Sequence, residues 1–314
     1  MKPKVEVPWQ TDGVHTWESH HGLVYAEKDG FKVIDCEQCG FKHITPIPTV
    51  EELESVYKHD YYSREKPLYL QRHQEDLDWW NLVYDERYDV LEQALSPDRR
   101  RLLEVGSGPG YFLARGKERG WDVTGIEPSN QAVEHSRGLG VNVIDGFLTD
   151  ENASELGLFD AIHASEVLEH LPDPRQMLEI MYGLLKPGGV VALSVPNDFN
   201  PLQFAACETQ SLDQWWVAPP HHINYFDHAS LANALQNTGF SVLSSEGSFP
   251  MEMFLLMGDG YVGNDELGRH VHAKRMRFDM AMRSSSLHGT KSALQQAFAN
   301  LGLGRLVVLL AKKH

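Results

Sequence analysis

Two acidic residues flank a glycine-rich turn near the middle of the chain. Glu104 lies in an apolar run, and Glu127 ends the next apolar run. Between them, Gly106, Gly108 and Gly110 stand at alternate positions. Glycines allow backbone amides to approach a ligand closely, and a carboxylate at a strand end can hold two ribose hydroxyls. The pattern predicts a strand, a turn, a helix and a second strand that together bind a cofactor containing adenosine.

The spacing of the glycines bears on the identity of this cofactor. A dinucleotide-binding turn has its third glycine where this chain has Tyr111, which weakens the case for a pyrophosphate ligand. Glu104 would point a negative charge into the turn, and such a charge suits a cationic ligand and repels a phosphate. S-adenosylmethionine carries a sulfonium and an ammonium group, so the sequence favours it. A nicotinamide-dependent oxidoreductase is the alternative.

Three further segments follow in order along the chain. Residues 165–174 read S-E-V-L-E-H-L-P-D-P, residues 184–189 read L-L-K-P-G-G, expected to form a turn between a helix and another apolar strand, and residues 222–226 read H-I-N-Y-F. Together with the glycine turn, these segments resemble the motifs of class I S-adenosylmethionine-dependent methyltransferases over residues 101–245. The resemblance implies an α/β fold: a Rossmann-like, seven-stranded, mostly parallel sheet with helices on both faces, plus a small N-terminal β-ribbon element.

The resemblance also implies roles for individual residues. Its reaction is an in-line displacement, in which the protein aligns an acceptor and removes its proton. His222, with His221 beside it, is the candidate base, because imidazole exchanges protons near neutral pH; the alternative is a histidine that caps a helix or fills a loop. Glu166 and His170 either face the acceptor together or brace their loop. The implied cofactor residues are Glu104, Gly106, Ser107, Gly108, Gly110, Tyr111, Glu127, Pro128, Phe147, Ser165 and Tyr62.

Cysteine and histidine pairs near the N-terminus form a second constellation. Cys36 and Cys39 have the C-x-x-C spacing with which two thiolates bind one metal ion. Upstream lie His15, His20 and His21, and residues 23–34 between the two groups are expected to form a β-hairpin. The arrangement resembles a zinc ribbon, with His15, His21, Cys36 and Cys39 as the ligands and His20 as a substitute. A vestigial knuckle with free thiols is the alternative, and a redox pair is disfavoured.

The chain divides into three parts on this reading. Apolar residues recur at helical spacing over residues 69–95, which predicts a helix ahead of the cofactor domain. Residues 250–304 are rich in Met and Phe, and flexible apolar side chains suit a substrate lid or a dimer contact, with core packing as the alternative. The expected parts are a zinc-ribbon-like element, 1–62; a helical lid or linker, 63–100; and an S-adenosylmethionine-binding domain, 101–314, with substrate insertions at 198–230 and 250–304.

Composition limits the partners. The 314 residues carry a formal net charge of −16, which repels a nucleic acid backbone. No apolar run approaches the ~20 residues of a membrane span, and the first ten residues lack a signal-peptide core, so a cytoplasmic protein is expected. The acceptor is therefore expected to be a small molecule, such as a sugar derivative, a quinone or lipid precursor or a secondary metabolite, methylated on oxygen. A binding protein that keeps the fold without catalysis is the remaining alternative.

Overall fold

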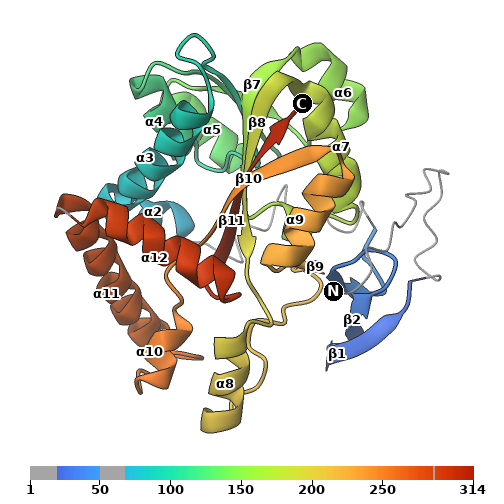
Figure 1. The fold of residues 1–314 in the computed structure, drawn as a ribbon, viewed down its shortest axis with the longest axis vertical. Helices are drawn as coiled ribbons and strands as arrows, with labels where there is room; N and C mark the ends of the chain where they lie inside the picture. The colour runs from blue at the N-terminus through green and yellow to red at the C-terminus, as the bar shows by residue number, and fades with distance from the viewer. Residues whose placement is uncertain (1–19, 50–67, 286) are drawn as a thin grey trace.

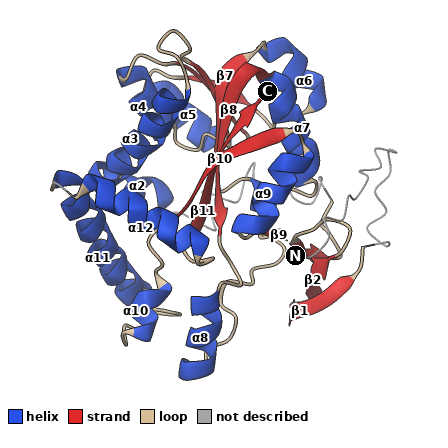
Figure 2. Ribbon diagram, viewed as in Figure 1, coloured by secondary structure: helices blue, strands red, loops and turns tan. Residues whose placement is uncertain are grey.

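A seven-stranded sheet forms the centre of the protein (Figures 1 and 2). The computed structural model describes residues 20–49, 68–285 and 287–314. The strand order is β10-β11-β8-β7-β4-β5-β6, and β11 alone runs antiparallel to its neighbours, which confirms the predicted fold class. The strands are β4 (Arg101–Val105), β5 (Asp122–Glu127), β6 (Asn142–Asp145), β7 (Phe159–Ser165), β8 (Leu185–Pro196), β10 (Phe240–Gly247) and β11 (Leu306–Lys313).

Helices cover both faces of this sheet, as Figure 2 shows. Successive side chains of a strand point to opposite faces, and β8 follows this rule: Val191 and Leu193 join one apolar cluster, whereas Val190 and Ala192 join another. The first cluster includes residues of α7 (Pro174–Leu184) and α9 (His228–Asn237), beside α6 (Asp150–Leu156). The second includes residues of α3 (Leu77–Ala94), α4 (Tyr111–Glu118) and α5 (Asn130–Gly138). The central strands are therefore buried on both sides, whereas the edge strands β6 and β10 are partly exposed.

A second, four-stranded sheet joins the N-terminal segment to the main domain. The predicted hairpin is confirmed as β1 (Gly22–Lys28) and β2 (Phe31–Cys36), and β3 (Lys42–Thr45) follows it. The fourth strand, β9 (Asn224–Tyr225), comes from the connection between α8 (Pro201–Gln210) and α9. Because β3 pairs with β9, two segments about 180 residues apart in sequence lie side by side (Figure 1).

Two local expectations were wrong. The helix predicted over residues 69–95 is broken at Asp76 into α2 (Tyr69–Glu75) and α3. The Asp76 carboxylate accepts hydrogen bonds from Arg269 of α11 (Asp265–Ser284), a distant partner that spacing within residues 69–95 could not indicate. The turn expected at the L-K-P-G-G segment lies inside β8, where the pairing with β7 shifts between Leu185 and Val190. Those residues form an irregularity in a continuous strand.

The Met-rich insertion, residues 250–304, forms α10 (Glu252–Leu256), α11 and α12 (His288–Asn300). Polar contacts fasten it to α3. The indole N–H of Trp79 donates to Asp279 at 3.0 Å, and the Lys291 ammonium lies 2.7 Å from a carboxylate oxygen of Glu86. The insertion therefore packs beside the helices that precede the cofactor domain.

Candidate functional site

The glycine turn connects β4 to α4 and takes left-handed backbone conformations. Gly110 has a φ of +79°, and a Cβ there would lie 2.5 Å from the Ser136 hydroxyl oxygen on α5. Gly106 has a φ of +67°, and a Cβ there would lie 2.7 Å from a methyl carbon of Val167. Only glycine fits both requirements at these positions. The turn thus brings β4, α5 and the segment after β7 into close contact.

Glu127 ends β5 and reaches across to this turn. One of its carboxylate oxygens accepts the amide of Gly108 at 2.8 Å, and the other accepts the amide of Ser129 at 2.9 Å. Burial raises the pKa of Glu127 to about 7, and the two amides oppose that shift by stabilising the charged form. The carboxylate is held rigidly while it faces a pocket, an arrangement that suits a diol donating two hydroxyl hydrogens.

Glu104 on β4 is 5% exposed and borders the same pocket. One carboxylate oxygen lies 3.0 Å from Nδ1 of His163 on β7, and the other has no hydrogen-bond partner within the described ranges. Burial and the charge of Glu127 raise the pKa of Glu104 well above its usual range, and burial lowers the pKa of His163 to about 3. His163 therefore stays neutral and cannot offset a carboxylate charge. The unsatisfied oxygen fits a ligand that brings a positive charge.

The pocket encloses about 670 Å³ and brings most of the predicted cofactor residues together. Gly110 does not line it, because that residue faces Ser136, and Tyr62 lies outside the described residues. The predicted residues that line the pocket are Glu104, Gly106, Ser107, Gly108, Tyr111, Glu127, Pro128, Phe147, Ser165, Glu166 and His170. Motifs from four parts of the sequence thus converge on one cavity.

An aromatic wall of the pocket comes from α2 and α3. His73 stacks between Trp80 and Tyr111, with ring centroids 4.6 Å and 4.7 Å apart and nearly parallel planes. The Tyr84 hydroxyl lies 2.8 Å from Nε2 of His73, and burial lowers the pKa of His73 to about 4. Sequence reasoning placed Trp80 and Tyr84 on a helix but missed His73. The seven-residue step from His73 to Trp80 could have indicated a shared face.

The segment after β7 also lines the pocket. Glu166 has a left-handed backbone with φ +55°, held by its amide donating to the Ser194 carbonyl at 2.8 Å. The 3₁₀ turn Leu168–His170 follows, and Nδ1 of His170 lies 2.7 Å from the His221 carbonyl oxygen. A strained non-glycine residue beside a pocket is a common mark of a functional site. Glu166 and His170 therefore both line the cavity.

His221 and His222, predicted as catalytic residues, are not among the residues that line this pocket. The His222 ring packs edge-on against His170 with centroids 5.1 Å apart, and its Nδ1 lies 3.9 Å from an Asp198 carboxylate oxygen. His222 thus packs against His170 and does not itself line the pocket. Within the described part of the chain, neither predicted substrate insertion, 198–230 or 250–304, contributes a residue to the lining.

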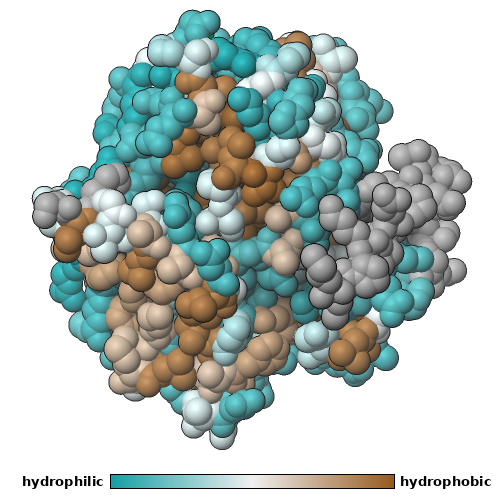
Figure 3. Space-filling model, viewed as in Figure 1, coloured by the Kyte–Doolittle hydropathy of each residue, from teal (hydrophilic) through white to brown (hydrophobic). Residues whose placement is uncertain are grey.

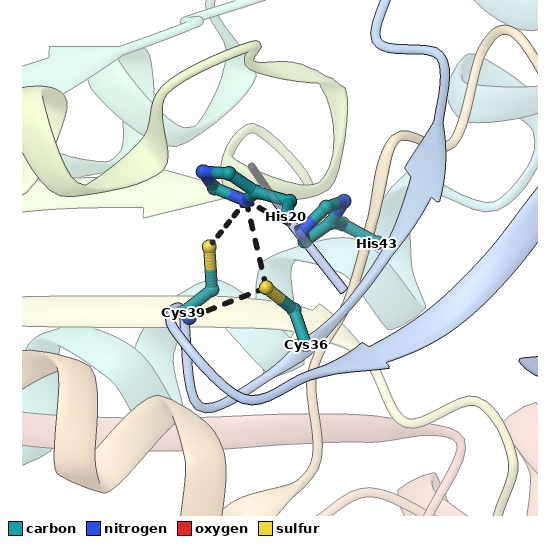
Figure 4. Close-up of side chains that lie close together, drawn as sticks. All are labelled: His20, Cys36, Cys39 and His43. Carbon is teal, nitrogen blue, oxygen red and sulfur yellow. Dashed lines mark hydrogen bonds between the residues drawn. The ribbon is translucent and has the colours of Figure 1, made fainter. Parts of the chain in front are cut away.

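The structure does not bring all four predicted metal ligands together. Cys36 and Cys39 lie together, and the histidines beside them are His20 and His43 (Figure 4). His21, predicted as a ligand, is largely exposed and lies 3.5 Å from a Glu37 carboxylate oxygen. His15 lies outside the described residues. Sequence reasoning missed His43 because it belongs to β3, beyond the expected knuckle.

Apolar surface gathers over the region of α10, α11 and α12 (Figure 3). The large apolar side chains exposed there are Leu256, Met257, Met280, Leu287 and Leu301. A homodimer contact through this insertion stays a prediction. No helix in the described ranges is long and apolar enough to cross a membrane.

Comparisons with known proteins bear on the family of this chain. The chain is 28% identical over 201 residues to the ubiquinone biosynthesis O-methyltransferase of Xanthomonas axonopodis, covering 56% of this chain and 84% of that protein. It is 37% identical over 124 residues to the enzyme of the same name from Dechloromonas aromatica, covering 38% and 53%. The chain thus spans about half the length of several curated relatives that it matches.

A solved S-adenosylmethionine-dependent methyltransferase from Archaeoglobus fulgidus is similar in structure, with a TM-score of 0.48, 20% identity, and coverage of 78% of this chain and 99% of that one. The model of a methyltransferase-domain family, Methyltransf_23, matches residues 77–245, which is more than half of the chain. This assignment replaces the oxidoreductase alternative. The chain belongs to this family and is an S-adenosylmethionine-dependent methyltransferase.

Proposed function

We propose that this methyltransferase methylates a hydroxyl oxygen of a small, largely apolar molecule, which binds between the aromatic wall and the segment carrying Glu166 and His170. The observation that carries the proposal is that one pocket is lined both by the cofactor motifs and by these two titratable side chains. In-line transfer requires cofactor and acceptor to meet in one cavity at near-contact distance.

In this proposal, the cofactor occupies the part of the pocket formed by the glycine turn. Glu127 accepts hydrogen bonds from the ribose hydroxyls, and Phe147 lies against the adenine. Glu104 faces the positively charged end of the cofactor, which explains an unsatisfied carboxylate oxygen in a buried position. Bound there, S-adenosylmethionine supplies an already activated methyl group, so the protein has only to align the acceptor and remove its proton.

His170 is the residue that we propose as the base. Its Nδ1–H donates to the His221 carbonyl, which leaves Nε2 as the basic nitrogen. The buried carboxylate of Glu169 lies 3.7 Å from Nε2 and would stabilise the imidazolium that forms on proton uptake. His222, favoured by the sequence, becomes a positioning residue because it packs against His170 outside the pocket lining. Glu166 is the second candidate for proton transfer, since it also lines the pocket.

The choice of acceptor rests on the lining and on the relatives. Trp80, Tyr84, Met177 and Ile180 border the cavity, and such side chains suit an aromatic or aliphatic body better than a free sugar. The curated relatives named above are O-methyltransferases of ubiquinone biosynthesis, which supports oxygen as the methylated atom. A phenolic hydroxyl on an apolar molecule satisfies both considerations.

The experiment is a product analysis with the purified full chain. S-adenosylmethionine with an isotopically labelled methyl group is incubated with matched acceptors that carry a phenol, an aniline or an activated carbon on the same apolar ring system. We expect label on the phenolic oxygen, together with one equivalent of S-adenosylhomocysteine. Transfer confined to nitrogen or carbon would overturn the oxygen assignment, and transfer only to highly charged acceptors would overturn the apolar class.

A further inference from the structure

Four metal-ligating side chains converge in the N-terminal sheet, and none of them lines the cofactor pocket. His20 precedes β1, Cys36 ends β2, Cys39 lies in the turn that follows, and His43 belongs to β3. Their ligand atoms all lie within 4.8 Å of one another, and Figure 4 shows the four side chains directed toward a common point. Cys36, Cys39 and His43 are all buried.

The distances between these atoms match the edges of a zinc tetrahedron. Bonds of about 2.3 Å to sulfur and about 2.05 Å to nitrogen place two nitrogens about 3.3 Å apart, and a nitrogen and a sulfur about 3.6 Å apart. Nδ1 of His20 lies 3.1 Å from Nε2 of His43, 3.3 Å from Sγ of Cys39 and 3.5 Å from Sγ of Cys36. Two thiolates and two neutral imidazoles also balance the charge of one divalent ion, so the buried site is neutral as a whole.

Contacts around the cluster orient its ligands. Nδ1 of His43 lies 2.8 Å from the backbone carbonyl oxygen of Ile44, so Nδ1 carries the proton and Nε2 is left to bind a metal. The amide of Cys39 donates to the sulfur of Cys36 at 3.4 Å. Gly40 has a φ of +73° and donates its amide to the Cys36 carbonyl at 2.9 Å, which closes the turn between the cysteines. A metal-binding knuckle needs this tight turn between the cysteines. It also needs Nε2 of His43 to be left unprotonated, as the contact of Nδ1 with Ile44 leaves it.

We propose that His20, Cys36, Cys39 and His43 bind one structural Zn²⁺ ion, and that this ion holds the wall of the pocket that carries His170. The second half of the proposal rests on the proposed function, whereas the metal site does not. Thiolates and imidazoles together select zinc over magnesium or calcium, which prefer oxygen ligands. The two thiol protons pass to solvent when the ion binds.

The link to the pocket runs through a short series of backbone and amide contacts. His43 is paired in register with Asn224 of β9. The Asn224 side-chain amide donates to the carbonyls of Leu168 and Leu171 at 2.8 Å and 2.7 Å, and thus brackets His170 on both sides. The amide of Ile223 donates to the Glu169 carbonyl at 2.7 Å. The ion would therefore fix β3, β3 fixes β9, and β9 fixes the turn that carries His170.

The metal site is tested first, by a measurement that does not depend on catalysis. The full chain, purified without chelators, is analysed for metal by mass spectrometry, and we expect one zinc ion per chain. Cys36→Ser and Cys39→Ser should lose it, whereas the matched control Cys207→Ser should keep it, because that cysteine lies outside the cluster. Zinc retained at the wild-type level in both knuckle variants, or a Cys36–Cys39 disulfide in the wild-type chain, would overturn the site.

Cobalt substitution of the wild-type chain covers the case in which the knuckle variants do not fold. Co²⁺ bound by two thiolates and two imidazoles gives a thiolate charge-transfer band and the strong visible absorption of a tetrahedral site. The weak absorption of octahedral cobalt, or a spectrum without the thiolate band, would contradict the ligand set.

The link to the pocket is tested by hydrogen–deuterium exchange of the wild-type chain before and after zinc removal. We expect faster exchange at the amides of residues 168–173 and unchanged exchange at residues 102–105 in β4. Asn224→Ala should keep its zinc and raise the KM for the acceptor about tenfold, with the affinity for S-adenosylhomocysteine unchanged. Unaltered exchange at residues 168–173 after zinc removal would overturn the link, whatever the outcome of the acceptor assays.

Discussion

The carboxylate of Glu127 and the amide of Gly108 meet at 2.8 Å, although they belong to different β-α units of the sheet. This contact ties the end of β5 to the turn after β4. It holds a buried carboxylate at the edge of the pocket, so the ribose site that we propose is formed before a ligand arrives.

Cofactor affinity should depend on pH through Glu127. Its pKa is raised by burial to about 7, so the free enzyme carries a growing fraction of neutral Glu127 as the pH falls below 7. The ionised form accepts two hydroxyl hydrogens, so binding favours that form and releases a proton. We expect the affinity for S-adenosylhomocysteine to be about tenfold higher at pH 8 than at pH 6. Calorimetric titration measures this, and a Glu127→Gln variant should bind weakly with no such dependence. An equal pH dependence in that variant would assign the effect to another group.

Glu104 should contribute to affinity by its charge. Glu104→Gln keeps an oxygen that can accept from His163 and removes the negative charge that Glu104 takes on when the cationic cofactor lies beside it. We expect the affinity for S-adenosylmethionine to fall by about 10- to 100-fold, the range for a hydrogen bond to a charged group. Glu151→Gln is the matched control, because Glu151 also borders the pocket and is exposed. Equal losses in the two variants would show that the position of Glu104 has no special role.

Gly110 should matter for stability rather than for ligand contact. Gly110→Ala forces a left-handed alanine, which costs about 1–3 kcal/mol, and also places a Cβ against Ser136. Gly120→Ala is the control, since Gly120 has a similar φ of +83° with nothing within 4 Å of its Cβ position. Thermal unfolding should show a larger loss for Gly110→Ala. Equal losses would mean that the contact between the turn and α5 relaxes without cost.

Substitutions of His170 and His222, whose rings pack against each other, should differ in their effect on kcat. His170→Ala removes the proposed base and should lower kcat by about 10²- to 10⁴-fold, with the affinity for S-adenosylhomocysteine preserved. His222→Ala removes a packing partner outside the pocket lining and should have a smaller effect on kcat. Single-turnover methyl transfer measures both. If His222→Ala is the more damaged variant, the base assignment reverts to His222.

The parts of the fold that sequence could predict are those set by neighbours in the chain. The strand, turn and helix around Gly106 follow from apolar periodicity and glycine conformation, both of which act over a few residues. Asp76, where the predicted helix is broken, is bound by Arg269, nearly 200 residues away, and no local pattern indicates that contact.

The residues of the candidate site likewise divide into those that the sequence could predict and those that it could not. The predicted cofactor residues lie at or just after the ends of predicted strands, and most of them line one pocket. His43 was missed because the pairing of β3 with β2, not the knuckle spacing, brings it beside the cysteines. His222 was favoured by its residue type and its loop, but exposure to the pocket depends on how the 3₁₀ turn at Leu168–His170 folds over it.

Binding of the cofactor product to the pocket between Glu104 and Glu127 tests the central claim most directly. Calorimetric titration of the full chain with S-adenosylhomocysteine should give one site per chain, and Glu127→Ala should abolish the binding. A parallel titration with NAD should give no saturable heat. Tight binding of NAD, or S-adenosylhomocysteine binding that survives Glu127→Ala unchanged, would contradict the account.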